Sequence, residues 1–245
     1  NGSTDIGAFE FNGIPNLLPT NNVLYVTPNG AGAKDGSSWA NAFDGAKFYN
    51  NVSKLAYALA NLSSGSQIWV ATGTYLPTDG TDRTISFVLK DNVSLYGGFA
   101  GYETAIEQRN IIENTTILSG NINNAGLVTD NTYQVVSCNT TTSLSTTIDG
   151  VTIMQGYANG SSPYSNGGGI YLSANSSLTL KNCSIKQNYA SQGGGGMYVL
   201  SNVYFENNII ENNSCNFFGG GIYFTGQGTM KSNVFQNNSA TTFSG

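Results

Sequence analysis

The feature that constrains this chain most is a repeat of 25 residues towards its C-terminal end. Glycine triplets open the segments GGGIYL, GGGMYV and GGGIYF, which begin at residues 167, 194 and 219. Three sets of positions then recur every 25 residues: Leu180, Phe205 and Met230; Ile185, Ile210 and Phe235; and Asn188, Asn213 and Asn238. One period shared by three independent columns is typical of a solenoid, in which each repeat is a coil stacked on the next.

The pattern inside each repeat predicts β-structure. Alternating apolar residues such as Leu178 and Leu180 indicate short strands with one buried face, and the glycine triplets and Asn pairs indicate turns. Stacking the coils at a strand spacing of about 4.8 Å would turn the apolar positions into continuous columns inside the solenoid. At a repeated turn Asn tolerates left-handed geometry, and its amide can bond the same group one coil away, so Asn188, Asn213 and Asn238 predict a ladder.

These columns predict the fold class. We expect an all-β chain that forms a right-handed, single-stranded parallel β-helix, with regular rungs over residues 167–245. One segment departs from the β pattern. Apolar residues recur at steps of three and four over residues 46–62, which predicts an amphipathic α-helix with Asp44 as N-cap and Gly65 at its end. Such a helix would cover the open N-terminal end of the solenoid.

Composition and charge exclude several classes of partner and cofactor. The nine basic residues are scattered in a chain of net charge −5, so no basic cluster favours nucleic acid. No apolar run reaches the roughly 18 residues of a membrane span, so we expect no membrane insertion by this segment. The chain has no His, and Cys138, Cys183 and Cys215 lie far apart, which excludes a zinc site and favours buried apolar thiols. We expect no cofactor.

Few residues could support catalysis, and we predict no catalytic residues. Glu206 falls in one column with Lys181 and Lys231, which is either a site or, as we expect, a solvated cross-rung ion pair worth about 0.2–1 kcal/mol. Asp79 and Asp82 in PTDGTDRT are candidate calcium ligands, although two carboxylates in a glycine-rich segment more commonly form the turn itself.

Aromatic residues in and near the rungs offer another kind of site. Aromatic faces that point outwards could stack on sugars, whereas those that alternate inwards would belong to the core. The candidates are Tyr164, Tyr198, Tyr204, Phe217, Phe218, Tyr223 and Phe224.

Several segments resemble known families. The runs LYVTPNGAGAKDGSSWANAF (24–43), QIWVATGTYLPT, SFVLKDNVSLYGGFAGYET, TILSGNI and GVTIMQGYANG resemble the start of bacterial right-handed parallel β-helix repeat proteins. The last rungs resemble the polymorphic outer membrane protein repeat, with its GG-aliphatic step and its F-x-x-N step at Phe235 to Asn238, where Ile185 and Ile210 replace Phe in the other rungs. The resemblance covers residues 22–245 and implies a large exported chain, extracellular or at the cell surface, with roles in adhesion or matrix building.

The termini suggest how the chain is organised. DIGAFEF (5–11) resembles the closing strand of such a β-helix unit, so we expect residues 1–11 to end a preceding unit, 12–21 to be a linker and 22–245 to form the next unit. Because Gly245 aligns with Gly220, we expect this last unit to be truncated. The expected partners are other units of the same long chain, self-association into fibres, or surface glycans.

The sequence therefore favours a structural or adhesive segment without catalytic activity. Two alternatives stay open. The first is a glycan-binding adhesin that uses exposed aromatics. The second is a polysaccharide lyase or glycoside hydrolase that works along a groove on the β-helix, although the paired carboxylates or calcium-binding acids of such sites are scarce here.

Overall fold

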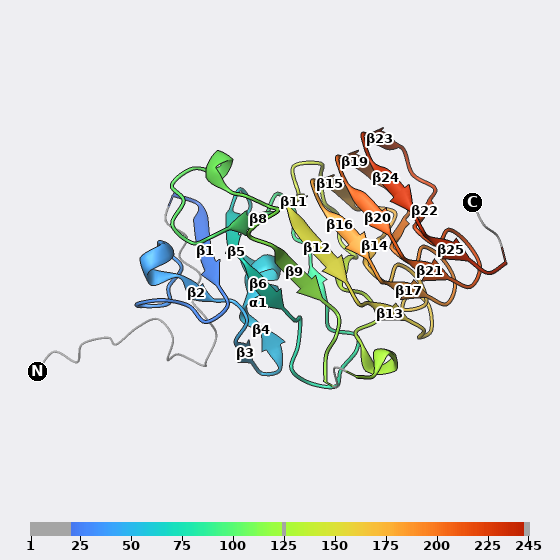
Figure 1. The fold of residues 1–245 in the computed structure, drawn as a ribbon, viewed down its shortest axis with the longest axis horizontal. Helices are drawn as coiled ribbons and strands as arrows, with labels where there is room; N and C mark the ends of the chain where they lie inside the picture. Colours follow the sequence, from blue (N-terminus) through green and yellow to red (C-terminus); the bar gives the residue numbers. More distant parts are fainter. Residues whose placement is uncertain (1–20, 124–125, 243–245) are drawn as a thin grey trace, which may run out of the picture.

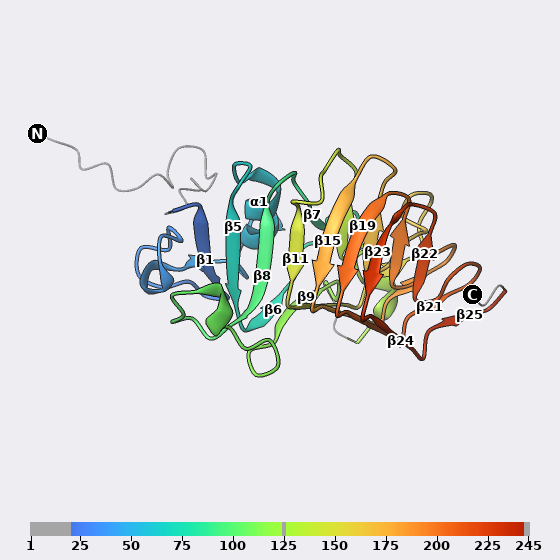
Figure 2. The ribbon, with the colours of Figure 1, turned by 90° about the horizontal axis from the view of Figure 1, so that it is seen from above.

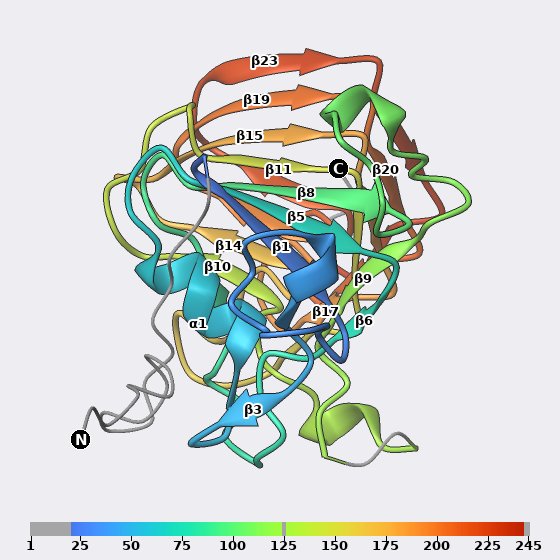
Figure 3. The same cartoon turned by 90° about the vertical axis from the view of Figure 1, so that its left-hand side faces the viewer.

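The computed structural model describes residues 21–123 and 126–242, which form a parallel β-helix (Figures 1 and 2). A full turn contributes one strand to each of four parallel sheets, as in β11 Thr147–Asp149, β12 Val151–Met154, β13 Tyr157–Ala158 and β14 Ile170–Leu172. Viewed from the N-terminal end, the turns run clockwise as the chain recedes, so the coil is right-handed (Figure 3). The predicted fold class is confirmed.

The first sheet has eight strands and runs the length of the molecule (Figure 2). Its inward column includes Leu180, Phe205 and Met230, which pair in the register that their 25-residue spacing predicts. The strand order is β2-β1-β5-β8-β11-β15-β19-β23, with β1 Val23–Thr27, β2 Phe43–Asp44, β5 Gln67–Ala71, β8 Ser94–Phe99, β15 Ser177–Lys181, β19 Asn202–Glu206 and β23 Gly228–Lys231.

The second sheet carries the Ile185, Ile210 and Phe235 column, again in the predicted register. Its order is β24-β20-β16-β12-β9-β6, with β6 Gly73–Tyr75, β9 Thr116–Ser119, β16 Ser184–Lys186, β20 Ile209–Glu211 and β24 Val234–Gln236.

The third and fourth sheets close the turn. The third has two-residue strands in the order β13-β17-β21-β25, with β17 Tyr189–Ala190, β21 Ser214–Cys215 and β25 Ser239–Ala240. The fourth has the order β22-β18-β14-β10-β7, with β7 Phe87–Val88, β10 Val136–Cys138, β18 Met197–Val199 and β22 Ile222–Phe224. Three 3-10 turns, η1 Trp39–Asn41, η2 Ile106–Gln108 and η3 Val128–Asp130, lie in the loops between strands.

The core is a continuous set of apolar columns inside the coil. In the first sheet Leu24, Ile68, Leu95 and Ile148 extend the Leu180 column towards the N-terminus, and all are fully buried. The narrow third sheet points only small residues inwards, namely Ala158, Ala190 and Cys215. All three cysteines are free and buried, as the sequence predicts for apolar fillers.

Asparagine ladders fill the corners between the second sheet and its neighbours. Asn188 Nδ2 donates to Asn213 Oδ1 at 3.0 Å, and Asn213 Nδ2 donates to Asn238 Oδ1 at 3.0 Å. One part of the prediction is wrong, because the left-handed residue is not the ladder asparagine but the one before it, such as Asn212 at φ 54°. The ladder ends at Gly156, where a Cβ would overlap the carbonyl oxygen of Gly168.

The predicted helix over residues 46–62 is too long, and its N-cap is wrong. Helix α1 spans Lys54–Asn61 and is capped by Ser53, whose Oγ accepts a hydrogen bond from the Ala56 N–H at 3.1 Å. The preceding residues form the hairpin of β3 Phe48–Tyr49 and β4 Val52–Ser53, because Asn50 and Asn51 adopt the positive φ angles of a tight turn. Asp44 lies in β2, and its Oδ1 forms an ion pair with Lys54 Nζ at 2.8 Å.

Helix α1 takes the place of a fourth-sheet strand in the first turn of the coil. It buries Leu55, Ala56, Ala58 and Leu59 and packs against β7, which is the first strand of that sheet. The helix thus covers the N-terminal edge of the fourth sheet (Figure 3). Helix α1 ends at Asn61 with Leu62 as its C-cap, one residue before the predicted end at 62, and Gly65 follows in the loop.

The last described rung is open to solvent. Strands β22, β23, β24 and β25 each lie at the edge of their sheet, and Met230 and Phe235 are 40% and 44% exposed, whereas their register partners Phe205 and Ile210 are 1% exposed. The expected closing strand at 1–11, nearly all of the linker at 12–21 and the predicted truncation at Gly245 fall outside the described residues. Among the residues described, no helix has the length and apolarity that a membrane span requires.

Candidate functional site

The column of Lys181, Glu206 and Lys231 lies in one outward row on the first sheet. Strand register brings Asp149, Lys181, Glu206 and Lys231 side by side along the axis of the coil. The same row continues towards the N-terminus through three aromatic residues, Tyr96, Trp69 and Tyr25. The sequence predicted only the Lys181, Glu206 and Lys231 part of this row, because the earlier rungs do not keep the 25-residue spacing.

Both acids in the row are already engaged. Asp149 Oδ2 pairs with Arg109 Nη2 at 2.9 Å, and its Oδ1 accepts from Asn182 Nδ2 at 2.8 Å. Glu206 lies between Lys231 at 2.9 Å and Lys181 at 3.3 Å. Hydrogen bonds from these two ammonium groups lower the pKa of the Glu206 carboxyl. A general acid needs a raised pKa instead. The charged residues of the row therefore form ion pairs and not an acid–base site.

The candidate calcium ligands are not gathered into a metal site. Asp79 and Asp82 are exposed. Asp82 Oδ1 accepts from the Thr84 N–H at 2.9 Å and from Thr84 Oγ1 at 2.6 Å, and these bonds lower the Asp82 pKa. This is the arrangement of a turn-forming Asp. Within residues 21–123 and 126–242, no group of three or more His, Cys, Asp or Glu side chains is placed to hold a metal ion.

The aromatic candidates are spread over separate faces and form no single strip. Tyr204 faces outwards on the first sheet, whereas Tyr198 stacks on Tyr223 with ring centroids 4.8 Å apart on the fourth. Tyr164 contacts Tyr133, and Phe224 packs against the core. The remaining two candidates, Phe217 and Phe218, are exposed at the turn before β22.

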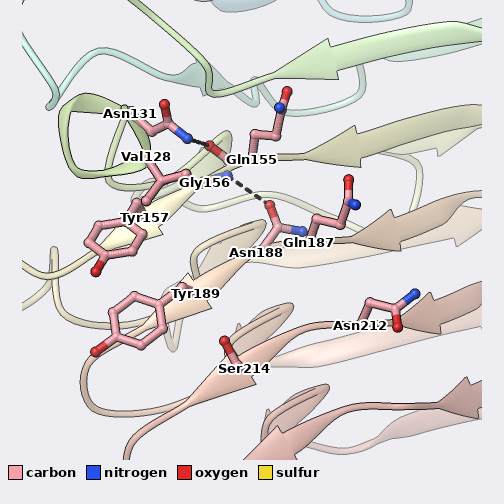
Figure 4. A pocket seen from close by; sticks show the side chains of 10 residues that line it. All are labelled: Val128, Asn131, Gln155, Gly156, Tyr157, Gln187, Asn188, Tyr189, Asn212 and Ser214. Atoms are coloured by element: carbon pink, nitrogen blue, oxygen red, sulfur yellow. Dashed lines mark hydrogen bonds between the residues drawn. The ribbon is translucent and has the colours of Figure 1, made fainter. Parts of the chain in front are cut away.

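A pocket that the sequence analysis missed lies where the second sheet meets the third (Figure 4). Its volume is about 370 Å³, which is within the range of small-molecule sites. The lining residues are Val128, Asn131, Gln155, Gly156, Tyr157, Gln187, Asn188, Tyr189, Asn212 and Ser214.

Two tyrosines form the aromatic wall of the pocket. Tyr157 and Tyr189 are register partners in the third sheet, and their rings stack with centroids 4.6 Å apart and an angle of 26°. They point outwards because Ala158 and Ala190 take the inward positions of the same short strands. Ser214 is the register partner of Tyr189 in the next rung, so the aromatic column stops there (Figure 4).

Neutral amides supply the rest of the polar lining. Gln155, Gln187 and Asn212 occupy the left-handed position of successive rungs, at φ 65°, 56° and 54°. Asn131 Nδ2 donates to the Gln155 carbonyl oxygen at 2.8 Å, which ties the loop after η3 to the pocket. None of the lining residues carries a charge. The pocket can therefore stack on a ring and exchange hydrogen bonds with hydroxyl groups.

The spacing of the early rungs explains why this pair was missed. Gly156 and Asn188 are 32 residues apart, whereas Asn188 and Asn213 are 25 apart. A search for columns at the shorter period passes over Tyr157 and Tyr189. The signal that could have found them was the match of Gly156 with the later asparagines, which sets the register of the next residue in each rung.

Comparisons with known proteins support the fold and leave the activity open. No protein-family model and no curated protein matches the sequence. Among solved structures, the crystal structure of pectate lyase Pel9A is similar, with a TM-score of 0.51 and 16% sequence identity. The match covers 90% of this chain and 47% of that one, so this chain spans about half the length of the lyase. The likeness shows a shared parallel β-helix fold.

Proposed function

We propose that this chain is a structural and adhesive segment of a longer repetitive protein, extracellular or at the cell surface, and that it has no catalytic activity. The observation that carries the proposal is that the negative charges in the outward row of the first sheet are paired with positive charges. Asp149 and Glu206 are the acids of that row, and each is held by cationic partners within 3.3 Å. A surface of this kind stabilises the stack of rungs.

The alternative of a carbohydrate-active enzyme has less support. Glycoside hydrolysis uses two carboxyl groups that flank the scissile bond, one of them with a raised pKa. Glu206 has a lowered pKa, and both of its oxygens are engaged by lysines. The resemblance to a pectate lyase rests on 16% identity and supports the fold alone.

An activity assay tests the proposal directly. We expect no sustained release of reducing ends or unsaturated products from polygalacturonate, pectin, alginate or xylan, with or without added calcium. We also expect the melting temperature to be unchanged by a chelator. Sustained product release that disappears in Glu206→Gln or Asp149→Asn would overturn the non-catalytic proposal, and Thr229→Ala on the same face is the matched control.

The low charge of the chain and its stacked rungs support the proposed location and partners. Only 9% of residues are charged, so neutral polar side chains provide most of the hydrophilic surface. The first two sheets run through most rungs of the coil, which suits stacking with further units of one chain or with other copies. Immunolabelling of intact source cells, before and after protease treatment, tests the surface location; signal found only after cell lysis would refute it.

A further inference from the structure

We infer that the pocket lined by Tyr157 and Tyr189 binds an uncharged polysaccharide that lies along the axis of the β-helix. This inference rests on the proposed adhesive function and names the ligand class that the segment would hold. It assigns the ligand to the corner of the second and third sheets (Figure 4), away from the charged row on the first sheet.

The aromatic wall fits a ring-shaped ligand with apolar faces. Tyr157 and Tyr189 are both half-buried and stack on each other, so each ring restricts the orientation of the other while part of each stays accessible. Their hydroxyl groups point in the same direction (Figure 4). Rigid aromatic side chains give contact area at a small entropic cost, and Tyr combines an apolar face with a polar end.

The column of aromatic rings is interrupted where the pocket opens. Ser214 follows Tyr189 in register, and Ser239 follows Ser214. A third ring in this column would continue the stack, but the small Ser214 side chain leaves that side of Tyr189 uncovered by another aromatic. A pyranose ring placed over Ser214 would occupy the position that an aromatic residue holds in the two preceding rungs.

The polar wall fits hydroxyl groups and disfavours charged ligands. Side-chain amides both donate and accept hydrogen bonds, as a sugar hydroxyl does. The side-chain amides of Gln187 and Asn212 are exposed and make no hydrogen bond to another described residue, so they can bond a ligand. No lining residue carries a charge, so a uronate or a phosphate would lose hydration without gaining an ionic partner.

The rung period favours an extended, repetitive ligand. The amide column of Gln155, Gln187, Asn212 and Asn237 and the Tyr157, Tyr189, Ser214 and Ser239 column both advance by one strand spacing per rung. Only the face of Tyr189 towards Ser214 is free of another aromatic ring, so one sugar would stack there and the next sugars of a linear polysaccharide would meet the amide column. A peptide would instead seek an open strand edge, and the third sheet is paired on both sides of β17 and β21.

Affinity electrophoresis provides the test. The intact chain is run in native gels that contain soluble xylan, galactomannan, mixed-linkage β-glucan or polygalacturonate, and titration calorimetry follows for any polymer that retards it. We expect retardation by at least one uncharged polymer. Tyr189→Ala should weaken that binding about three- to ten-fold, as expected for loss of one aromatic contact. Ser214→Tyr, which fills the pocket with a third ring, should abolish it.

The controls separate binding from folding and from catalysis. Tyr204→Ala removes an outward tyrosine from the first sheet and should bind as the original protein does. Circular dichroism and the melting temperature show whether each variant is folded. No retardation by any uncharged polymer, retardation by polygalacturonate alone, or equal binding by Ser214→Tyr would overturn the inference. Those outcomes leave the non-catalytic proposal standing, whereas release of products from a polymer would overturn that proposal whatever the binding result.

Discussion

At the scale of single residues, neighbouring asparagines in the regular rungs have different roles. Asn212 provides a left-handed backbone at the corner, whereas Asn213 points inwards and is 1% exposed. Asn213 Nδ2 donates to the Ile185 carbonyl at 2.9 Å and to Asn238, and its Oδ1 accepts from the backbone and side chain of Asn188. The amide is thus fully bonded in a buried place, which is the condition under which a buried polar group stabilises a fold.

A second ladder was not predicted from the sequence. Asn208 Nδ2 donates to Asn233 Oδ1 at 2.9 Å, and Asn208 Oδ1 accepts from the Cys183 N–H at 3.0 Å. Asn208 and Asn233 are 25 residues apart in the sequence, but the equivalent position in the preceding rung is Cys183, so only two asparagines mark this column.

Removing a ladder amide should be costly. We expect Asn213→Ala to lower the free energy of unfolding by about 2–4 kcal/mol, because it leaves the buried Asn188 N–H without its acceptor and removes one hydrogen bond from the Ile185 carbonyl. Urea unfolding followed by circular dichroism measures the loss. Gln236→Ala is the matched control, since it removes an exposed amide bonded to Glu211, and should change stability by less than about 0.5 kcal/mol. Equal losses in the two variants would contradict the ladder's role.

The buried thiols make a second prediction. Burial raises the pKa of Cys183 to about 12, and Cys138 and Cys215 are also buried. We therefore expect almost no reaction with a thiol reagent at pH 8 until the protein unfolds, when three thiols per chain should react. Rapid labelling of the folded protein would contradict this.

The raised pKa of Cys183 also determines how stability changes with pH. The unfolded chain loses the Cys183 proton near its ordinary pKa of 9.0, while the folded chain keeps it to about 12. The contribution to stability is therefore complete below pH 9 and is lost as the pH rises towards 12. Unfolding midpoints should fall across this interval, and less so in Cys183→Ala.

At the scale of elements, the sequence predicted well those strands whose spacing is constant. The columns that start at Leu180, Ile185 and Asn188 predicted the register of the last three rungs, because every rung there has the same length. Where the loops differ in length, equivalent positions in successive rungs are 32 residues apart, so the stack of Tyr157 on Tyr189 was not predicted. The residues before α1 were misassigned because apolar steps of three and four also occur across the Asn50–Asn51 hairpin.

The N-cap provides a test at this scale. Ser53→Ala should lower the free energy of unfolding by about 1 kcal/mol, since the Ala56 N–H loses its buried acceptor at the start of α1. Chemical denaturation measures the difference. Ser63→Ala, in the exposed segment after the helix, is the control and should be nearly neutral. A loss at Ser63 as large as that at Ser53 would refute the assigned cap.

At the scale of the whole molecule, the described residues include a rung whose strand edges are unpaired. Helix α1 covers the N-terminal edge of the fourth sheet, whereas the last described rung presents apolar side chains and strand edges to solvent. Such an edge is a template for pairing with another strand. It suits the proposed association of units and copies.

We therefore expect the purified chain to associate in a concentration-dependent manner through this edge. Val234→Lys, at a side chain that is 47% exposed, should shift the mass measured by light scattering towards the monomer at the same concentration. Ile112→Lys places the same charge at an exposed position far along the chain and should leave association unchanged. Association that persists equally in both variants would place the contact elsewhere.

The parallel register of the rungs also determines how the molecule would bear a load. The hydrogen bonds between rungs run along the axis of the coil, so tension applied to its two ends would open the rungs one after another instead of shearing all of them together. Each regular rung would then release 25 residues, or roughly 85 Å of extended chain. A tether built in this way yields gradually under a pull and dissipates energy in equal steps before it fails.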